Sequence, residues 1–320
     1  MYCHVTSKER DKGKDIDVST SIGFFTVATG DEHYYKIAAN LLRSYRHFTK
    51  NALPFAILAD RENAYTREFD RTILLDSPTN SYLDKLALYD YLPYDVSVFM
   101  DADCLAYGDL NAIFAHFENA DDFCCYGRVL PLEDKTGWFN YEDLGELQSR
   151  VSYCVGLHGG IYYIRRSEKA AAVFETAKQI AADYKKYNFK GHFSTPGDEP
   201  ILALSMALQG CRPIPFRPEG ICCYWEYENG MDLNVKFGIA RIRKNGQRTH
   251  LVHWGTRFTR GLLYQKQVAG LELCRSGQNG IPLALSDGKY NGKIALEKAG
   301  KLAVRVKNKL YRTIVRGSKK

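Results

Sequence analysis

Long apolar runs are missing from this 320-residue chain. No segment approaches the roughly 18 consecutive apolar residues of a membrane-spanning helix. Residues 1–19 are polar and lack the apolar centre of a secretory signal, and no internal repeat or low-complexity tract is present. The sequence therefore predicts a cytoplasmic protein, with enough residues to bury the core of one large α/β domain or two smaller ones.

The cysteines lack the spacing of a metal site. Nine are scattered along the chain, two pairs of them adjacent (124–125 and 222–223), and none forms a Cys-x-x-Cys motif. An odd number without such spacing favours reduced, mostly buried thiols in a reducing compartment. The same observation argues against a zinc site.

Excess positive charge is missing from the body of the chain. The formal net charge is +7, but residues 293–320 alone contain ten Lys/Arg and one acidic residue, Glu297, a balance of +9. The other 292 residues sum to −2. A nucleic-acid-binding fold would carry its basic residues along one face, so nucleic acid is not an expected partner.

Apolar runs and helical periods alternate along the chain. Strands are predicted at 22–28, 54–59, 71–75, 96–100, 122–126, 159–165 and 249–254, and helices at 34–45, 82–91, 110–117, 167–187 and 201–208. Such alternation predicts an α/β fold with a mixed, mostly parallel sheet and helices on both faces. Residues 130–153 have no clean period and are predicted to form an active-site loop.

Two carboxylates, Asp101 and Asp103, directly follow the apolar strand Val96–Met100. Ligands of open α/β sheets bind outside the carboxyl ends of strands, where this pair is expected. Neighbouring carboxylates repel each other unless a cation lies between them, and a hard divalent cation with oxygen ligands commonly also holds phosphates. The alternative is a pair of Asp residues that caps a surface turn.

Six segments follow one another in a characteristic order: Phe25–Thr29 with Tyr34 and Tyr35 after it, Asp84–Leu86 with Tyr91–Asp95, Phe99–Asp103 with Gly108–Leu110, His158–Tyr162, Asp198–Pro200 and Val252–Gly255. Over about residues 22–260 this order resembles GT-A glycosyltransferases of family 8, the group of glycogenin and lipopolysaccharide galactosyltransferases. The chain departs from that family at His158, where asparagine is usual, and lacks its Lys-Pro-Trp after the metal histidine. Arg257, Arg260 or Lys266 could supply the missing charge.

The resemblance implies that Asp101, Asp103 and His253 hold one Mn²⁺ or Mg²⁺, which binds the diphosphate of a nucleotide sugar. A structural role for His253 is the alternative, and His250 is a rival ligand. The resemblance further implies a donor site formed by Thr26, Ala28, Thr29, Tyr35, Asp60, Lys85, Asp101 and Ala102. Asp60 could instead cap a helix, and Lys85 could be a solvated helix lysine.

For catalysis the resemblance implies Asp198, Glu199 and His158 near the reacting sugar, which passes from a UDP-sugar to a glycan or lipid-linked acceptor with retained configuration. Acidic residues at a helix start are also stabilised by the helix dipole alone. One alternative function is a sugar-phosphate nucleotidyltransferase, although Ala28–His33 offers one glycine and no basic residue. An aspartyl phosphatase, with the motif on its first strand, or a non-catalytic membrane-surface protein are the others.

The C-terminal segment predicts a basic amphipathic helix. Leu302, Val306, Leu310 and Ile314 recur every four residues among Lys and Arg. Such a helix is typical of one that lies on an anionic membrane, although a solvated or disordered tail is the alternative. We therefore expect an N-terminal extension (1–20), a catalytic domain (21–270) and a C-terminal extension (271–320), with peripheral attachment to the inner face of a membrane through 293–320.

Overall fold

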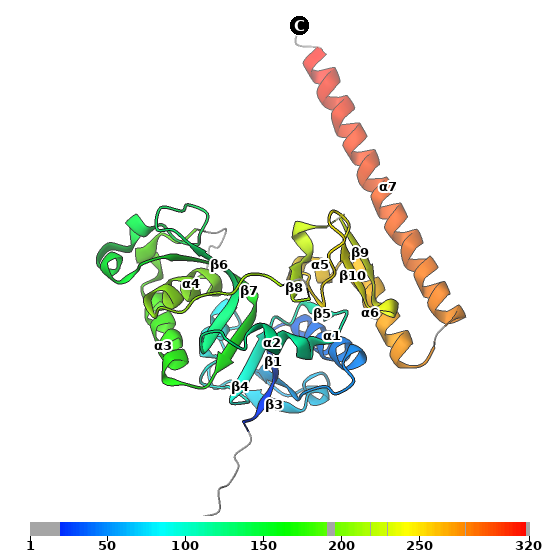
Figure 1. Cartoon of the computed structure of the whole chain (residues 1–320). Coiled ribbons are helices and arrows are strands. Elements are labelled where there is room, and N and C mark those ends of the chain that lie inside the picture. Colours follow the sequence, from blue (N-terminus) through cyan, green and yellow to red (C-terminus); the bar gives the residue numbers. More distant parts are fainter. Residues whose placement is uncertain (1–19, 191–195, 218, 229, 279, 318–320) are drawn as a thin grey trace, which may run out of the picture.

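A six-stranded sheet forms the centre of the molecule (Figure 1). The computed structural model describes residues 20–190, 196–217, 219–228, 230–278 and 280–317, so residues 1–19 of the expected N-terminal extension lie outside it. The strand order is β3-β2-β1-β4-β7-β6. Only β7 runs opposite to the other five, which confirms a mixed, mostly parallel sheet. The strands are β1 (Ile22–Ala28), β2 (Phe55–Ala59), β3 (Arg71–Leu74), β4 (Val96–Met100), β6 (Phe123–Leu130) and β7 (Cys154–Arg165).

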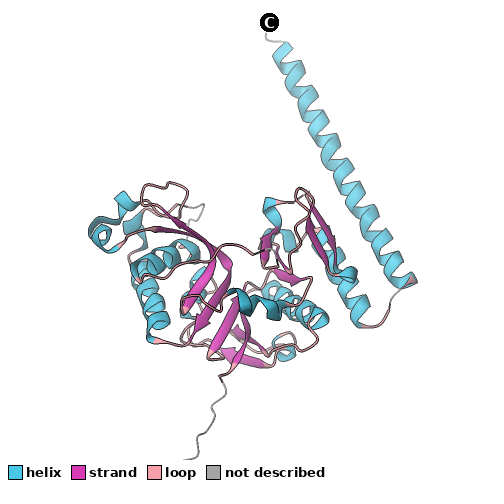
Figure 2. Cartoon of the chain, in the orientation of Figure 1, coloured by secondary structure: helices cyan, strands magenta, loops and turns pink. Residues whose placement is uncertain are grey.

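Helices cover both faces of this sheet, as expected (Figure 2). Because side chains alternate along a strand, Phe24 and Phe25 of β1 point to opposite faces and belong to separate apolar cores. The core around Phe24 includes α1 (Glu32–Phe48), and the core around Phe25 includes α3 (Glu168–Ala182) and α4 (Asp198–Leu208). Both cores are therefore fixed by the same central strands.

A small three-stranded sheet lies beside the central one, in the order β5-β11-β8. Its strands are β5 (Cys104–Ala106), β11 (Leu251–His253) and β8 (Ile221–Cys223). His253 pairs with Cys104 on one side and with Cys223 on the other, so the three residues form one row across the sheet. Further elements on this side are the hairpin β9 (Met231–Asn234) and β10 (Ile239–Ile242), α2 (Ile113–His116), α5 (Thr256–Thr259) and α6 (Leu262–Arg275).

The helix predicted at 82–91 is wrong in type and extent, because the structure has a short 3₁₀ helix at Tyr82–Ala87. Three consecutive residues, Asp84, Lys85 and Leu86, are all buried there. Asp84 accepts hydrogen bonds from Thr29 and Thr79, and Lys85 pairs with Asp101 and Asp198. The segment is shaped by the polar contacts of Asp84 and Lys85 rather than by a hydrophobic stripe.

None of residues 130–153, expected to form an active-site loop, lines the cavity described below. Phe139, Leu144, Val151 and Tyr153 belong to the apolar core around Phe25, and Tyr141–Arg150 consists of two short 3₁₀ helices that meet at a kink at Gly145. Other predicted elements differ mainly in their ends: β6 continues to Leu130, α3 stops at Ala182 and is followed by the 3₁₀ turn Tyr184–Tyr187, and β11 covers only Leu251–His253.

The last helix, α7 (Ile281–Gly317), is longer than predicted and extends away from the body (Figure 1). Its first turns pack on α6, where Leu283 is buried and Asp287 pairs with Lys266 at 3.4 Å. Farther along, Leu296 and Leu302 are 75% and 62% exposed, so this part of the helix has an apolar surface without a covering core. No helix among the described residues is both long and apolar enough to cross a membrane.

Gly23→Ala tests the packing of β1. A Cβ at Gly23 would lie 2.6 Å from the carbonyl oxygen of Pro54 and 2.4 Å from the ring of Tyr94. Such overpacking is expected to lower the free energy of unfolding by about 1–3 kcal/mol, measured by denaturant titration. Gly288→Ala in α7 is the matched control, because a Cβ there meets nothing within 4 Å. Its unfolding midpoint is expected to stay equal or rise, and an equal loss in both variants would contradict this account.

Candidate functional site

A cavity of about 380 Å³ opens where β1 and β4 end side by side. The chain runs from β1 outward to β2 and β3 and then returns to the other side of β1 as β4, and α/β sheets bind ligands at such a switch in strand order. The lining comes from the end of β1, the segment before Lys85, the start of α1 and the turn after β4. The residues are Val27, Ala28, Thr29, Tyr34, Ile37, Asn80, Ser81, Tyr82, Lys85, Asp101, Ala102, Asp103 and Thr256.

Asp101 and Asp103 line this cavity, and His253 contacts both of them. The Nε2 atom of His253 lies 3.0 Å from Oδ1 of Asp103 and 3.4 Å from Oδ2 of Asp101. Oδ1 of Asp103 is buried without a hydrogen-bond partner, whereas its Oδ2 accepts a hydrogen bond from Thr256. Two carboxylate oxygens and one imidazole nitrogen at these separations fit the donor set of Mn²⁺ or Mg²⁺.

His253 and Asp103 influence each other's protonation. Burial, the largest single influence, would lower the pKa of His253, but the charge and contact of Asp103 together with the charge of Asp101 outweigh it, and the net shift is upward. Burial would likewise raise the pKa of Asp103, but His253 opposes it and holds the pKa of that carboxyl below its usual value. The pair therefore favours an ionised carboxylate at the end of the cavity.

Lys85 is a buried cation between two carboxylates. Its Nζ lies 2.7 Å from Oδ1 of Asp101 and 3.0 Å from Oδ2 of Asp198. Burial would lower the pKa of Lys85, but these two carboxylates outweigh it and raise the pKa, so the amine stays charged. The solvated helix lysine considered as an alternative is excluded, since only 9% of the side chain is exposed.

Asp198 and Glu199 begin α4 and contact β7. Tyr162 donates its hydroxyl hydrogen to Oδ2 of Asp198 at 2.8 Å, and the Gly159 N–H donates to Oε1 of Glu199 at 2.6 Å. Burial, and next the charge of Asp198, raise the pKa of Glu199 to about 7. Near neutral pH Glu199 can therefore both donate and accept a proton.

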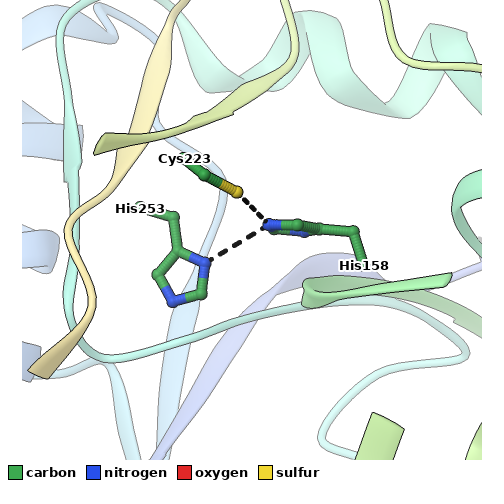
Figure 3. A group of neighbouring side chains, drawn as sticks. All are labelled: His158, Cys223 and His253. Atoms are coloured by element: carbon green, nitrogen blue, oxygen red, sulfur yellow. Dashed lines mark hydrogen bonds between the residues drawn. The ribbon is translucent and has the colours of Figure 1, made fainter. Parts of the chain in front are cut away.

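His158 lies behind His253, on the side away from the carboxylates (Figure 3). Its Nε2 is 3.4 Å from Nδ1 of His253 and 2.7 Å from Sγ of Cys223. Burial, and next the neighbouring His253, lower the pKa of His158 to about 3, so its ring is neutral. His158 thus contacts the histidine of the carboxylate cluster and not Asp198 or Glu199.

The residues expected around the nucleotide separate into two groups. Ala28, Thr29, Lys85, Asp101 and Ala102 line the cavity. Thr26, Tyr35 and Asp60 are not among its lining residues, and each has a buried side-chain oxygen without a hydrogen-bond partner. The aromatic ring at the cavity is that of Tyr34, because the helical turn of α1 directs Tyr35 into the core instead.

The basic residues considered for the diphosphate lie elsewhere. Lys266 pairs with Asp287 of α7, Arg260 lies 3.8 Å from Asp31, and the Arg257 guanidinium covers the ring of Phe258. The rival ligand His250 has its Nδ1 3.0 Å from the carbonyl oxygen of Asp109. Of the cationic side chains in the described residues, Lys85 is the one that lines the cavity.

Several residues at the site were not found from the sequence. Asp84 is buried and accepts hydrogen bonds from Thr29 and Thr79, which fixes the segment before Lys85 against β1. Tyr82 and Thr256 line the cavity, and Cys223 contacts His158. Only Asp84, directly before Lys85, lay in a motif that the sequence had singled out.

Glu199→Gln tests the buried carboxyl through stability. A raised pKa means that the folded chain binds this proton more tightly than the unfolded chain. The stabilisation by protonation is thus present below pH 4.5, the ordinary value, and is lost as the pH rises to about 7. At pH 8 the free energy of unfolding of the variant is expected to exceed that of wild type by on the order of 2–3 kcal/mol. At pH 4.5 the two free energies are expected to be similar.

The same substitution at exposed Glu146 controls for the loss of one negative charge. Denaturant titrations at both pH values measure the difference. A Glu199→Gln variant that is less stable than wild type at pH 8 would contradict the raised pKa.

No family model matches the chain, and no curated protein matches it. Similar solved structures include mouse xyloside xylosyltransferase 1 in its apo form (12% identity, TM-score 0.45, 73% of this chain and 98% of that chain). The apo WbbM bifunctional glycosyltransferase (13%, 0.43, 74% and 46%) is another, as is galactosyltransferase LgtC in complex with donor and acceptor sugar analogs (14%, 0.46, 74% and 94%). These three alignments cover 73–74% of this chain, at 12–14% sequence identity.

Proposed function

We propose that the chain is a metal-dependent glycosyltransferase that moves a sugar from a nucleotide diphosphate sugar, of the UDP class, to a glycan or lipid-linked acceptor with retained configuration. The observation that carries the proposal is the meeting of Asp101, Asp103 and His253 with the Lys85–Asp198 pair at the end of one cavity. A diphosphate needs cationic partners, and a sugar needs hydrogen-bonding groups beside it. This arrangement offers both within one site.

Asp101, Asp103 and the Nε2 atom of His253 would hold one Mn²⁺ or Mg²⁺. When bound, such an ion neutralises the negative charge that develops on the leaving diphosphate. The protein's own part is to keep the ligands in place: Thr256 fixes one oxygen of Asp103, and Lys85 fixes one oxygen of Asp101. The other oxygen of each carboxylate is then directed toward His253.

The nucleotide would lie against the end of β1. Ala28 and Thr29 line the cavity there, and the rings of Tyr34 and Tyr82, 39% and 50% exposed, stand at its edge. Aromatic faces suit stacking of a base, which is worth roughly 1–3 kcal/mol. Thr26, Tyr35 and Asp60 would lie behind the residues that line the cavity. Their buried oxygens without hydrogen-bond partners would reach the nucleotide only after a local movement.

The donor sugar would lie toward Asp198 and Glu199. Lys85 holds one oxygen of Asp198, and the Gly159 N–H holds one oxygen of Glu199. The remaining carboxyl oxygens can accept hydrogen bonds from sugar hydroxyls, and the pKa of Glu199 near 7 also lets it donate one. His158 would support the reaction through His253.

Residues 21–270 would form the catalytic unit and 271–320 a membrane-attaching extension, with residues 1–20 ahead of both. The support for attachment is the charge of 293–320 together with the exposed apolar residues of α7. Basic residues near an anionic surface contribute about 1 kcal/mol each. A lipid-linked or cell-envelope acceptor at the inner face of a membrane would then lie near the cavity.

Calorimetry with UDP and Mn²⁺ tests the proposed site. Wild type is expected to bind UDP only with Mn²⁺ or Mg²⁺ present, and to hydrolyse a UDP-sugar slowly. Asp103→Asn keeps the side-chain shape but removes a charged ligand, so turnover is expected to fall by at least about 100-fold. Asp90→Asn is the matched control, because Asp90 is exposed and pairs with Lys178. UDP binding that does not need a divalent ion would refute metal dependence.

Vesicle sedimentation tests the extension. A chain that ends at Gly292 is expected to lose binding to vesicles with anionic lipid while it still binds UDP with Mn²⁺. In the full chain, replacing the exposed Lys298, Lys301 and Arg305 together by Gln is expected to weaken binding by about 3 kcal/mol. Neutral vesicles are the control for non-electrostatic adsorption. Equal binding by the full and shortened chains would overturn the assignment.

A further inference from the structure

Nitrogen and sulfur donors meet on the far side of His253 from the carboxylates. The register of the small sheet places Cys223 of β8 next to His253 of β11, with both side chains on one face. His158 of β7 reaches the same point from the central sheet (Figure 3). Three donor atoms from three separate strands thus lie together: Nε2 of His158, Sγ of Cys223 and Nδ1 of His253, all within 4.8 Å of one another.

The separations are close to those of a metal site. In a tetrahedral zinc centre, bonds of about 2.0 Å to nitrogen and 2.3 Å to sulfur place neighbouring donors about 3.3–3.6 Å apart. The two histidine nitrogens are 3.4 Å apart, and the Cys223 sulfur is 2.7 Å from Nε2 of His158. For a cation to bind, the Cys223 sulfur therefore has to move away from Nε2 of His158 by less than about 1 Å.

The surroundings keep this space for the three side chains. A Cβ at Gly160 would lie 2.6 Å from the ring of His158 and 2.8 Å from Nδ1 of His253, so a larger residue would displace the donors. Cys223 and His253 are 3% and 9% exposed, whereas His158 is partly exposed and packs beside the half-exposed ring of Phe216. A cation can reach the cluster from the His158 side.

We propose that His158, Cys223 and His253 form a second binding site, for a thiophilic divalent cation of the Zn²⁺ class, on the opposite side of the His253 ring from the oxygen-rich site. Binding breaks the S–H bond of Cys223 and, in a protonated His253 ring, the Nδ1–H bond, and these protons pass to solvent. The ring proton of His158 then resides on Nδ1, so the present hydrogen bond from the Gly160 N–H to that atom, at 3.2 Å, is given up. Three protein ligands leave a fourth position for water.

The two sites share one imidazole, so they compete. A neutral ring offers a lone pair on only one nitrogen, and a thiophilic cation on Nδ1 therefore leaves the proton on Nε2. Nε2 is the atom that faces Asp101 and Asp103. Zn²⁺ is thus expected to weaken Mn²⁺ binding at the carboxylates, a consequence that rests on the proposed function.

Cobalt absorption tests the site without any assay of activity. Chelator-treated full chain, kept reduced with a phosphine, is titrated with Co²⁺. We expect a thiolate-to-cobalt charge-transfer band that saturates at one equivalent and is bleached by Zn²⁺. Cys223→Ser is expected to lose the band and to bind Zn²⁺ at least about tenfold more weakly. Cys222→Ser is the matched control, since its neighbouring buried thiol faces the other side of β8 and is expected to keep the band.

The wild-type titration decides the question even where a variant fails to fold. No charge-transfer band in wild type, or a band that persists in Cys223→Ser, overturns the site. Competition is measured separately, as the fold-loss of Mn²⁺-dependent UDP binding caused by Zn²⁺ in wild type and in Cys222→Ser, but not in Cys223→Ser. A cobalt band together with no UDP binding in any variant would refute the proposed function and leave the thiophilic site standing.

Discussion

The buried ammonium of Lys85 holds together groups that would otherwise repel one another. Asp101 follows β4 and Asp198 begins α4, and both carboxylates lie within 3.0 Å of this one cation. Removing one partner of a buried ion pair leaves an uncompensated charge, which typically costs about 3–5 kcal/mol. The short 3₁₀ segment Tyr82–Ala87 positions that cation, and Asp84 holds the segment to Thr29, at the end of β1, by a hydrogen bond. One ion triad thus joins the turn after β4, the 3₁₀ segment and the start of α4, of which the first two line the cavity.

His253 is the second point on which the arrangement depends. It lies between two strands of the small sheet, with carboxylates on its Nε2 side and a histidine and a thiol on its Nδ1 side. The ring of Trp225 packs against it at 4.8 Å between centroids. A cation or hydrogen-bond partner on one ring nitrogen therefore decides whether the other nitrogen carries a proton, because the packed ring cannot turn away from either group.

The alternation of strands and helices was readable because each central strand is a short apolar run closed by a polar residue. Asp101 and Asp103 were readable for the same reason, since they directly follow such a run. Their partners Lys85, Asp198 and His253 were named only through the family resemblance, because no local pattern shows which distant segments the fold brings together. Tyr35 was expected at the nucleotide from the sequence, whereas Tyr34 lines the cavity, because the rotation of α1 decides which of the two faces it. The helix expected at 82–91 did not allow for the charged side chains of Asp84 and Lys85, which point inward.

Cysteine spacing illustrates the limit of local patterns most clearly. A Cys-x-x-Cys motif places two thiols in one turn, so its absence speaks only about sites built from one segment. Here the row Cys104–His253–Cys223 is made by strand register, and His158 joins it from another sheet. Along the chain, His253 is 149 residues from Cys104, 95 from His158 and 30 from Cys223. Sheets can therefore assemble soft donors from scattered residues, and only the pairing of strands reveals such a set. The carboxylates on the other side of the same imidazole lie in one segment, so the sequence alone was enough to find them.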